Sequence, residues 1–476
     1  MSLAQRSVRS SSYTITASAI TTVIQLVRSI LLARILSPDD FGIYAFAFSF
    51  VIFTKAVPLF GLGGALIHHC AESEGEPAYQ THFTLTAIFT LIWAVIVAIV
   101  GYFYSTPENR WIIWIILATQ VIDNLVQTGA NILAKQVKFR RVAVIQTLST
   151  LLSTTTALLL AWQGFGVFSL VSTDIIEAIV PLAGYYLIKP VWKVRIKLYK
   201  EIVPYFLQFG QRAFLTGLLQ DILDNLDNLW THRILGKSAL GFYSRAYTFA
   251  TYPRKVLATP LASVSVATYA ELKDERKLLS QAFFRVNAFL IRLGFLFAGL
   301  LTLLAPEFIQ LVIGEKWAPM LTAFRLMLIF TLLDPLKNTI GGLFIAVGKP
   351  EVTVRIRLIQ FIVMVVCLAT LSKSFGIAGV ALSVDVMIVA GIIMLLTKSR
   401  QYVDFSIRQL FLIPFLALSL GIFVSWLLIN FTSESYSPWA SGSIKTVSFI
   451  TLYASVILFF ERKQIPLILR MVKLIK

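Results

Sequence analysis

The fold of this chain is decided at residues Gln208–Thr231, which read QFGQRAFLTGLLQDILDNLDNLWT. The stretch is too apolar to be a solvated loop, yet small or polar residues recur at every third or fourth position. They share one face of an α-helix, and they are Gly217, Gln220, Asp224, Asp227 and Thr231. The sequence therefore predicts a mostly apolar helix with a single polar stripe.

The same stripe occurs 199 residues earlier, in the first apolar run of the chain. Its members, in the same phase, are Ser18, Thr21, Gln25 and Arg28. Arg28 stands where the later copy has Asp227. Beyond this helix, ARILSPDDFGIYAFAFSF (Ala33–Phe50) aligns at the same offset with HRILGKSALGFYSRAYTF (His232–Phe249), and the two segments share seven identities.

A second pair of segments supports a duplication. QVIDNLVQT, from Gln120, aligns with TLLDPLKNT, from Thr331, at an offset of 211, which places Asp123 over Asp334. The two alignments together predict a duplicated chain whose second half begins near Glu201.

The composition is that of a polytopic membrane protein. Of 476 residues, 57% are hydrophobic and 14% are charged, about half the charged share of soluble domains. Apolar runs of roughly 20 residues recur from end to end and do not alternate at period 2, so the spans are helices. We expect an all-α protein with about fourteen transmembrane helices, at 13–36, 41–66, 83–104, 111–134, 142–162, 165–188, 206–231, 240–267, 283–304, 320–346, 352–372, 377–397, 409–430 and 443–460.

The net charge of +18 indicates membrane topology rather than nucleic-acid binding. With the N-terminus inside, the cytoplasmic segments and adjoining span ends hold 25 basic residues and the outer ones hold seven. Both termini are then cytoplasmic, as are the cluster Lys135–Arg141, the linker Val191–Lys200 and the basic tail Arg462–Lys476. The acidic segment Ala71–Gln80 does not fit this pattern, although it falls on the inner side.

Motifs for enzymes, metals and nucleotides are absent from the sequence. Cys70 and Cys367, the only cysteines, sit at or in hydrophobic stretches, which implies neither a disulfide framework nor a metal site. Gly342–Lys349 ends in Gly-Lys, but its spacing is wrong for a phosphate-binding loop. We therefore expect no catalytic residues, no metal and no cofactor.

Ten basic residues fall within predicted spans or at their ends, where each costs on the order of 3 kcal/mol at a helix centre. Five of them belong to the first two helices of each half, and these are the candidate substrate-binding residues: Arg28, Lys55, Arg245, Arg254 and Lys255. Lys55 and Arg254 are repeat equivalents at mid-span. One interpretation is internal ion pairing, such as Arg28 with Asp227. The other is a water-filled cationic cavity for an anionic group, which is favoured because cations outnumber acids in these helices.

Acidic residues in the spans are candidates for coupling to an ion or proton gradient, which we expect because no nucleotide site is present. The candidates are Asp123, Asp224, Asp227 and Asp334. For Asp174 and Asp385 the favoured interpretation is a buried carboxyl hydrogen-bonded to a neighbouring helix.

The segment LLARILSPDDFGIYAFAFSF resembles the polysaccharide transporter branch of the multidrug/oligosaccharidyl-lipid/polysaccharide exporter superfamily, and within it Wzx-type flippases. The segments LGFYSRAYTFATYPRKVLATPLASV, PEFIQLVIGEKW and FGIAGVALS extend the likeness over nearly the whole chain. It implies two six-helix lobes related by a pseudo-twofold axis, at 1–200 and 201–400, followed by two helices and the basic tail at 401–476.

The resemblance also implies a function. Such a protein moves an undecaprenyl-pyrophosphate-linked oligosaccharide across the bacterial cytoplasmic membrane by alternating access, for O-antigen, capsule or exopolysaccharide synthesis. A polysaccharide polymerase and glycosyltransferases are the partners it suggests. The idea carried over to the site is that basic residues line the cavity.

Three other functions stay open. A multidrug exporter of the same superfamily usually has twelve spans, and a basic cavity would repel cationic drugs. A lipid II flippase has fourteen spans and a cationic cavity too, so only the resemblance of these stretches speaks against it. A membrane glycosyltransferase needs a sizeable outer loop, and Phe431–Gly442 is too short for one.

Overall fold

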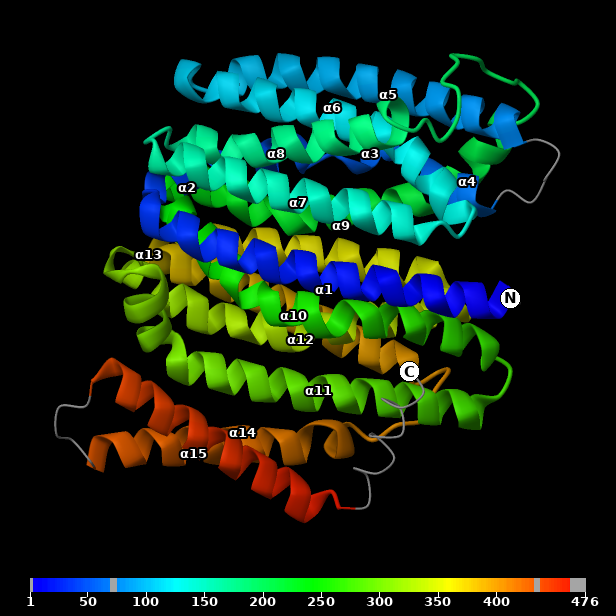
Figure 1. The fold of residues 1–476 in the computed structure, drawn as a ribbon. Coiled ribbons are helices and arrows are strands. Elements are labelled where there is room, and N and C mark those ends of the chain that lie inside the picture. The colour runs from blue at the N-terminus through cyan, green and yellow to red at the C-terminus, as the bar shows by residue number, and fades with distance from the viewer. Residues whose placement is uncertain (1–2, 69–74, 432–436, 463–476) are drawn as a thin grey trace. The chain divides into compact units, whose positions relative to one another are not determined.

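The computed structural model describes residues 3–68, 75–431 and 437–462, and within these ranges every regular element is helical (Figure 1). The chain divides by its contacts into two compact units, Met1–Gly241 and Phe242–Lys476. The basic tail beyond Arg462 and residues 71–74 of the acidic segment lie outside the described residues. The predicted domain limits at 200 and 400 stay predictions.

The first unit contains α1 (Leu3–Ile35), α2 (Pro38–Ile52), α3 (Ala56–Leu59), α4 (Leu62–His68), α5 (Gly75–Tyr104), α6 (Pro107–Lys135), α7 (Phe139–Trp162), α8 (Val167–Leu182), the π-helical turn η2 (Ala183–Leu187) and α9 (Val203–Leu235). Helix α10 (Lys237–Glu271) begins in this unit and continues into the second. The second unit then contains α11 (Arg276–Glu307), η3 (Phe308–Ile313), η4 (Glu315–Met320), α12 (Leu321–Ala346), α13 (Pro350–Ser399), α14 (Ile407–Phe431) and α15 (Pro438–Phe460).

Eleven helical runs among the described residues are long and apolar enough to cross a membrane. The chain is therefore an all-α polytopic membrane protein, as the composition predicts. Helices α9 and α10 are also long enough, with 33 and 35 residues, but they carry several charges. The 50-residue α13 merges two helices at Gly376, whose φ of 56° and ψ of −137° lie outside the helical region. With α13 counted as two spans and α9 and α10 included, the fold is compatible with fourteen.

The start of α2 is fixed by its own sequence. Ser37 caps the helix: its hydroxyl accepts from the backbone N–H of Asp40, and the Asp40 carboxylate accepts from the backbone N–H of Ser37. Pro38 follows at the first helical position, where its missing N–H costs nothing. The predicted second span is nevertheless not one helix, because the chain leaves α2 after Ile52 and forms two short helices, α3 and α4.

Two repeat-equivalent glycines bring the starts of α2 and α10 close together within the first unit. A Cβ at Gly42 would lie 1.8 Å from the carbonyl oxygen of Lys237, and a Cβ at Gly241 would lie 1.9 Å from that of Pro38. No side chain fits at either position. Lys237 and Ser238 also contact the carboxylate of Asp39. The glycine identity in the repeat therefore reports a reciprocal backbone contact.

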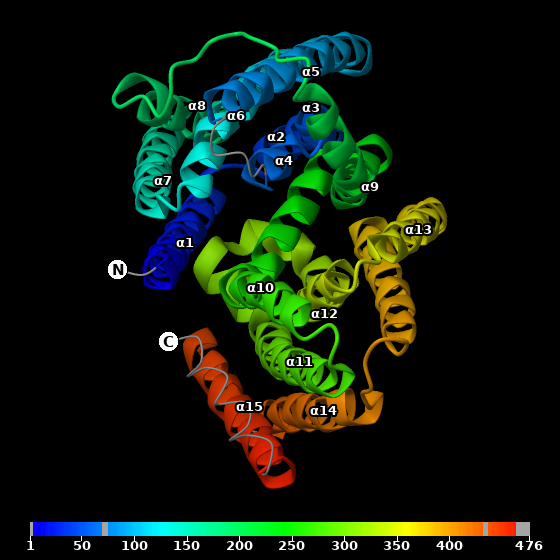
Figure 2. The ribbon, with the colours of Figure 1, turned by 90° about the vertical axis from the view of Figure 1, so that its right-hand side faces the viewer.

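In the first unit, α7 packs against both α1 and α8, as the end-on view makes clear (Figure 2). The predicted linker Val191–Lys200 has no helix in the structure. It is held to α5, because the backbone of Lys197 bonds with the hydroxyl of Thr84 and the N–H of Tyr199 donates to Thr81. Trp192, within the linker, is buried in a hydrophobic cluster that contains several aromatic residues.

In the second unit, α11 packs against α12, α14 and α15. The guanidinium of Arg292 on α11 bonds to both carboxylate oxygens of Glu461, the residue that follows α15. The hydroxyl of Tyr453 donates to the carbonyl of Arg292 at 2.7 Å. Arg292 is one of the basic residues that the sequence places inside a span, and the pairing with Glu461 compensates its burial.

Candidate functional site

A polar cluster links α1, α7 and α8 inside the first unit. The Nη1 atom of Arg28 donates to Oε1 of Glu177 at 2.9 Å and to the hydroxyl of Ser153 at 2.9 Å. On the neighbouring helix α2, the hydroxyl of Tyr44 donates to Asp174 at 3.0 Å. Arg28 thus lies at a position where its charge is balanced by an acid from another helix.

Lys55 lies in the break between α2 and α3. Its ammonium donates to Asp123 at 2.9 Å and to Gln120 at 2.7 Å, both on α6, against which α2 packs. The backbone N–H of Ala56, at the start of α3, is hydrogen-bonded by α9: it donates to the carboxylate of Asp221 at 2.6 Å. A helix start within a span needs such an acceptor because no water replaces it in the bilayer.

Arg254 lies on the unbroken helix α10, in the second unit. Its Nη1 atom contacts Oδ2 of Asp334 on α12 at 2.5 Å, and the ammonium of Lys337 contacts the other oxygen of that carboxylate at 2.9 Å. The Asp334 side chain is 2% exposed, whereas the side chain of Arg254 is 24% exposed. Two cations therefore share one buried acid here.

The two sites are related by the internal repeat. Lys55 and Arg254 are equivalent at the offset of 199, and Asp123 and Asp334 are equivalent at the offset of 211. The sequence predicts both equivalences, but it does not predict that the cation pairs with the acid. The structure shows this ion pair in each unit.

The remaining predicted residues lie on α9 and α10. Arg245 is half-buried, while Lys255 is exposed with its ammonium 5.3 Å from the ring centre of Tyr252, within range of a cation–π contact. Asp224 is exposed and accepts from the amide of Gln220 at 2.6 Å. Asp227 is buried, and its carboxylate accepts from the backbone N–H of Asn228.

Two sequence-based interpretations need correction. Arg28 pairs with Glu177 rather than with Asp227, because α1 packs against α7 and brings Arg28 near α8. Asp385 is buried, but neither of its carboxylate oxygens has a hydrogen-bond partner among the described residues. The expected hydrogen bond is present for Asp174 only.

Glu177 is the residue that the sequence reasoning missed. It follows Asp174 by three positions in α8, so both carboxylates lie on one helix face. Two acids so close within an apolar run are a signal for a cationic partner.

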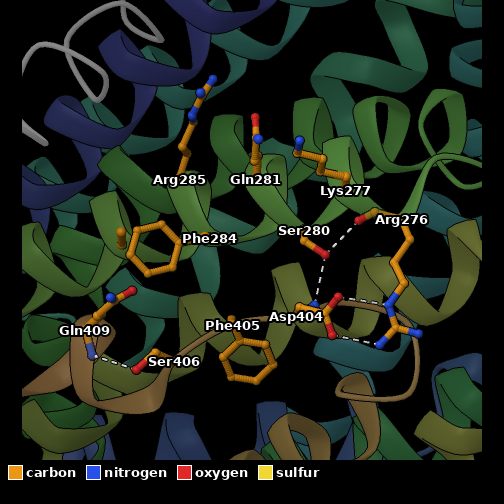
Figure 3. A pocket seen from close by; sticks show the side chains of 11 residues that line it. Arg276, Lys277, Ser280, Gln281, Phe284, Arg285, Asp404, Phe405, Ser406 and Gln409 are labelled. Carbon is orange, nitrogen blue, oxygen red and sulfur yellow. Dashed lines mark hydrogen bonds and ion pairs between the residues drawn. The ribbon is translucent and has the colours of Figure 1, made fainter.

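A cavity of about 670 Å³ lies in the second unit, between the start of α11 and the segment before α14 (Figure 3). Its basic residue Arg276 is engaged by Asp404 through two bonds, of 3.0 and 2.8 Å, and the hydroxyl of Ser280 accepts from the Asp404 N–H. The bonded Arg276 guanidinium holds the pKa of the Asp404 carboxyl below its usual value. Lys277 and Arg285 also line this cavity.

Comparisons with known proteins agree with this fold. A family model described as polysaccharide biosynthesis protein matches residues 31–322. The lipopolysaccharide biosynthesis protein WzxC of Escherichia coli K12 is 21% identical over 386 residues, 80% of this chain and 78% of that protein. The succinoglycan biosynthesis transport protein ExoT of Rhizobium meliloti is 26% identical over 301 residues, 60% of this chain and 58% of that protein.

Among solved structures, the lipid II flippase MurJ in an inward closed conformation has a TM-score of 0.76 at 16% identity, over 94% of this chain and 99% of that one. An inward-facing multidrug transporter of the MATE family has a TM-score of 0.55 at 16% identity, over 82% of this chain and 94% of that one. These likenesses concern the fold. The family match spans more than half of the residues, and the chain thus belongs to the polysaccharide biosynthesis protein family, in the polysaccharide flippase branch of the exporter superfamily that the sequence resembles.

Proposed function

We propose that this protein moves an undecaprenyl-pyrophosphate-linked oligosaccharide across the bacterial cytoplasmic membrane by alternating access, supplying O-antigen, capsule or exopolysaccharide synthesis. Both termini are then cytoplasmic, and a polysaccharide polymerase and glycosyltransferases are the expected partners. The names of the relatives support the polysaccharide pathway, and the basic residues inside the helices support a lipid-linked anion as the cargo.

The observation that carries the proposal is the matched pair of cations at Lys55 and Arg254. Lys55 lies at the break in the apolar run Pro38–His68, and Arg254 lies within the 35-residue helix α10. Each contacts an acid, and their side chains keep 25% and 24% of their surface exposed. Charges kept only for packing would be sealed. A partly open cation can instead exchange its carboxylate for a phosphate oxygen.

The acids explain how these cations persist without substrate. An unpaired charge in a low-dielectric interior is costly, so a carboxylate partner stabilises the empty protein. A pyrophosphate offers several charged oxygens in place of one carboxylate and can compete for the same donors. In the second unit, Asp334 stays paired with Lys337 when Arg254 binds the ligand instead.

Energy coupling is part of the proposal. Asp123 and Asp334 are already neutralised by cations, so we favour Asp224 and Asp227 over them as proton or sodium sites. Transport measured in vesicles should fall when both gradients are collapsed, and again in Asp224→Asn with the gradients intact. Undiminished transport without either gradient would mean uncoupled flipping.

Arg254 provides the cleaner test of the cargo. Arg254→Gln leaves Asp334 paired with Lys337, so the protein should insert and accumulate normally, while surface polysaccharide should fall at least tenfold. Arg254→Lys should retain part of the export because a point charge remains. Arg276→Gln, which removes a basic residue from the exposed pair with Asp404, is the control and should export normally.

Lys55 needs a double variant because Lys55→Gln leaves Asp123 without its cation. Lys55→Gln/Asp123→Asn removes both charges and should restore protein level but not export. If the double variant exports normally, Lys55 serves only to balance Asp123. Normal export in Arg254→Gln as well would contradict the role of these cations in binding the cargo.

A further inference from the structure

A groove of about 710 Å³ lies on the first unit between α7 and the end of α8 with the turn η2. It is separate from the Arg28 cluster, because it is lined by Leu148 and Leu152 of α7, whereas the neighbouring face of that helix presents Ser153 to Arg28. The groove is therefore not needed for the site already described. Its basic residues lie at one end, and apolar residues line the rest.

One end of the groove is strongly basic. Lys138, Arg140, Arg141 and Lys189 line it, and none of the described residues that line it is acidic. Arg141 is held in place by the carbonyl oxygens of Gly184 and Lys189. Lys138 and Arg140 are exposed and make no ion pair with the described residues. Four positive charges at one opening favour a ligand with a negative head.

The remainder of the groove is apolar and open. Val144, Leu148 and Leu152 follow one another at intervals of four along α7, with 58%, 48% and 43% of their surface exposed. Ile179 from α8 forms part of the opposite wall and is also exposed. Residues 144–152 extend for about 12 Å along the helix axis. In a membrane protein such a surface contacts hydrocarbon chains.

The local backbone is shaped to build this groove. Helix α6 ends in a Schellman arrangement, in which the N–H of Lys138 bonds to the carbonyl of Leu133 and Val137 adopts φ = 57°. A β-branched residue at positive φ is strained, and it sets the turn from which Lys138 emerges. On the opposite wall, a Cβ at Gly184 would lie 2.9 Å from the Cδ1 atom of Ile145, so a larger residue there would require the Ile145 side chain to shift.

We propose that this groove binds one anionic glycerophospholipid of the bilayer, with its phosphate among Lys138, Arg140 and Arg141 and an acyl chain along Val144–Leu152. Guanidinium groups suit phosphate oxygens because they donate in pairs. The charge pattern of the sequence predicts that the Lys135–Arg141 cluster lies at the cytoplasmic leaflet, where anionic headgroups can enter basic pockets between helices. The proposal does not depend on which molecule the protein transports.

The second cavity, near Arg276, offers the matched comparison. It also has basic residues, but Arg276 is bound to Asp404 and polar side chains such as Gln281 and Gln409 line it (Figure 3). It lacks the separation into a basic end and an apolar channel. Removing two of its cations therefore changes net charge by the same amount without touching the groove.

The test is lipid retention by the purified full-length protein in detergent, counted by native mass spectrometry with added phosphatidylglycerol or phosphatidylcholine. Wild type should retain one phosphatidylglycerol, and K138Q/R140Q should retain at least fivefold less at the same melting temperature. L148W, which fills the apolar channel and keeps all charges, should also lose it. K277Q/R285Q should behave as wild type.

Several results would overturn the proposal. Equal retention of phosphatidylcholine would show that charge is not recognised, and equal loss in K277Q/R285Q would show that the groove is not the site. Phosphate chemistry could also come from the transported lipid, so undecaprenyl pyrophosphate is the competing probe. If it displaces phosphatidylglycerol from wild type at equal concentration, and K138Q/R140Q no longer binds it, the groove belongs to the cargo.

Discussion

The two halves of the chain hold equivalent ion pairs in different surroundings. Lys55 lies in a break between helices, and its partner Asp123 keeps 38% of its side chain exposed. Arg254 lies in an unbroken helix, and its partner Asp334 is buried and shared with Lys337. One copy is thus a balanced pair, and the other carries one positive charge in excess.

The difference shows which features the two copies share and which differ between them. The position of a cation and the position of its acid are kept in both copies, because each charge requires the other inside the membrane. The helix geometry and the second cation are not kept. Under the function proposed above, the surplus charge of the second copy is available to an anionic ligand.

The largest expected effect comes from removing the buried acid. Asp334→Asn leaves Arg254 and Lys337 beside each other without a counter-charge, which should destabilise the protein by about 3–5 kcal/mol. Asp123→Asn leaves only Lys55, which is partly exposed and still contacts Gln120, and should cost about 1–3 kcal/mol. Melting of the purified variants in detergent compares the two. Equal losses would mean that burial and the second cation do not distinguish the copies.

The sequence predicts much of this comparison. Hydropathy predicts the spans, and the internal alignment matches Lys55 with Arg254 and Asp123 with Asp334. The pairing itself depends on α2 packing against α6 and on Arg254 reaching α12, and helix periodicity carries no information about such neighbours.

Other features were beyond sequence reasoning for local reasons. The break at Phe53–Lys55 contains neither glycine nor proline, and the Asp221 carboxylate that satisfies it comes from α9, far along the chain. The lone carboxyl of Asp385 looks in sequence like that of Asp174, yet only Asp174 has a tyrosine hydroxyl within reach.

A second substitution, with a smaller expected effect on stability, gives the second copy the charge balance of the first. Lys337 aligns with Val126 at the offset of 211, so Lys337→Val gives the second half the charge balance of the first. Asp334 keeps Arg254, and we expect stability to change by roughly 1 kcal/mol or less. Export should nevertheless fall severalfold if the surplus cation helps to hold an anion. The measurement is surface polysaccharide normalised to protein level.

The control for Lys337→Val is Lys445→Met. Lys445 is also a lysine with most of its side chain covered, 15% being exposed, and it is paired with an acid, Glu307, but it lies on α15. Its loss should lower stability and protein level without reducing export per molecule. Unchanged export in Lys337→Val would show that the excess charge of the second copy has no part in transport.

The smallest expected effect concerns the exposed pair Arg276–Asp404, which serves as the reference for the pair Arg254–Asp334, whose acid is buried. The pKa of Asp404 is lowered in the folded protein by its hydrogen bonds to Arg276, so the pair stabilises the fold above the unfolded pKa of about 3.9, and this contribution is lost as the pH falls through the folded pKa. The Asp404→Asn variant should therefore melt slightly below wild type at pH 7, and the melting temperatures of the two proteins should converge toward pH 3.

The difference in melting temperature between Asp404→Asn and wild type should also shrink in 1 M salt, because exposed charges are screened over about 3 Å there. The loss caused by Asp334→Asn should depend less on salt, since the Asp334 side chain is only 2% exposed. If both variants responded to salt alike, the contrast between open and buried pairs would not explain how the two copies differ.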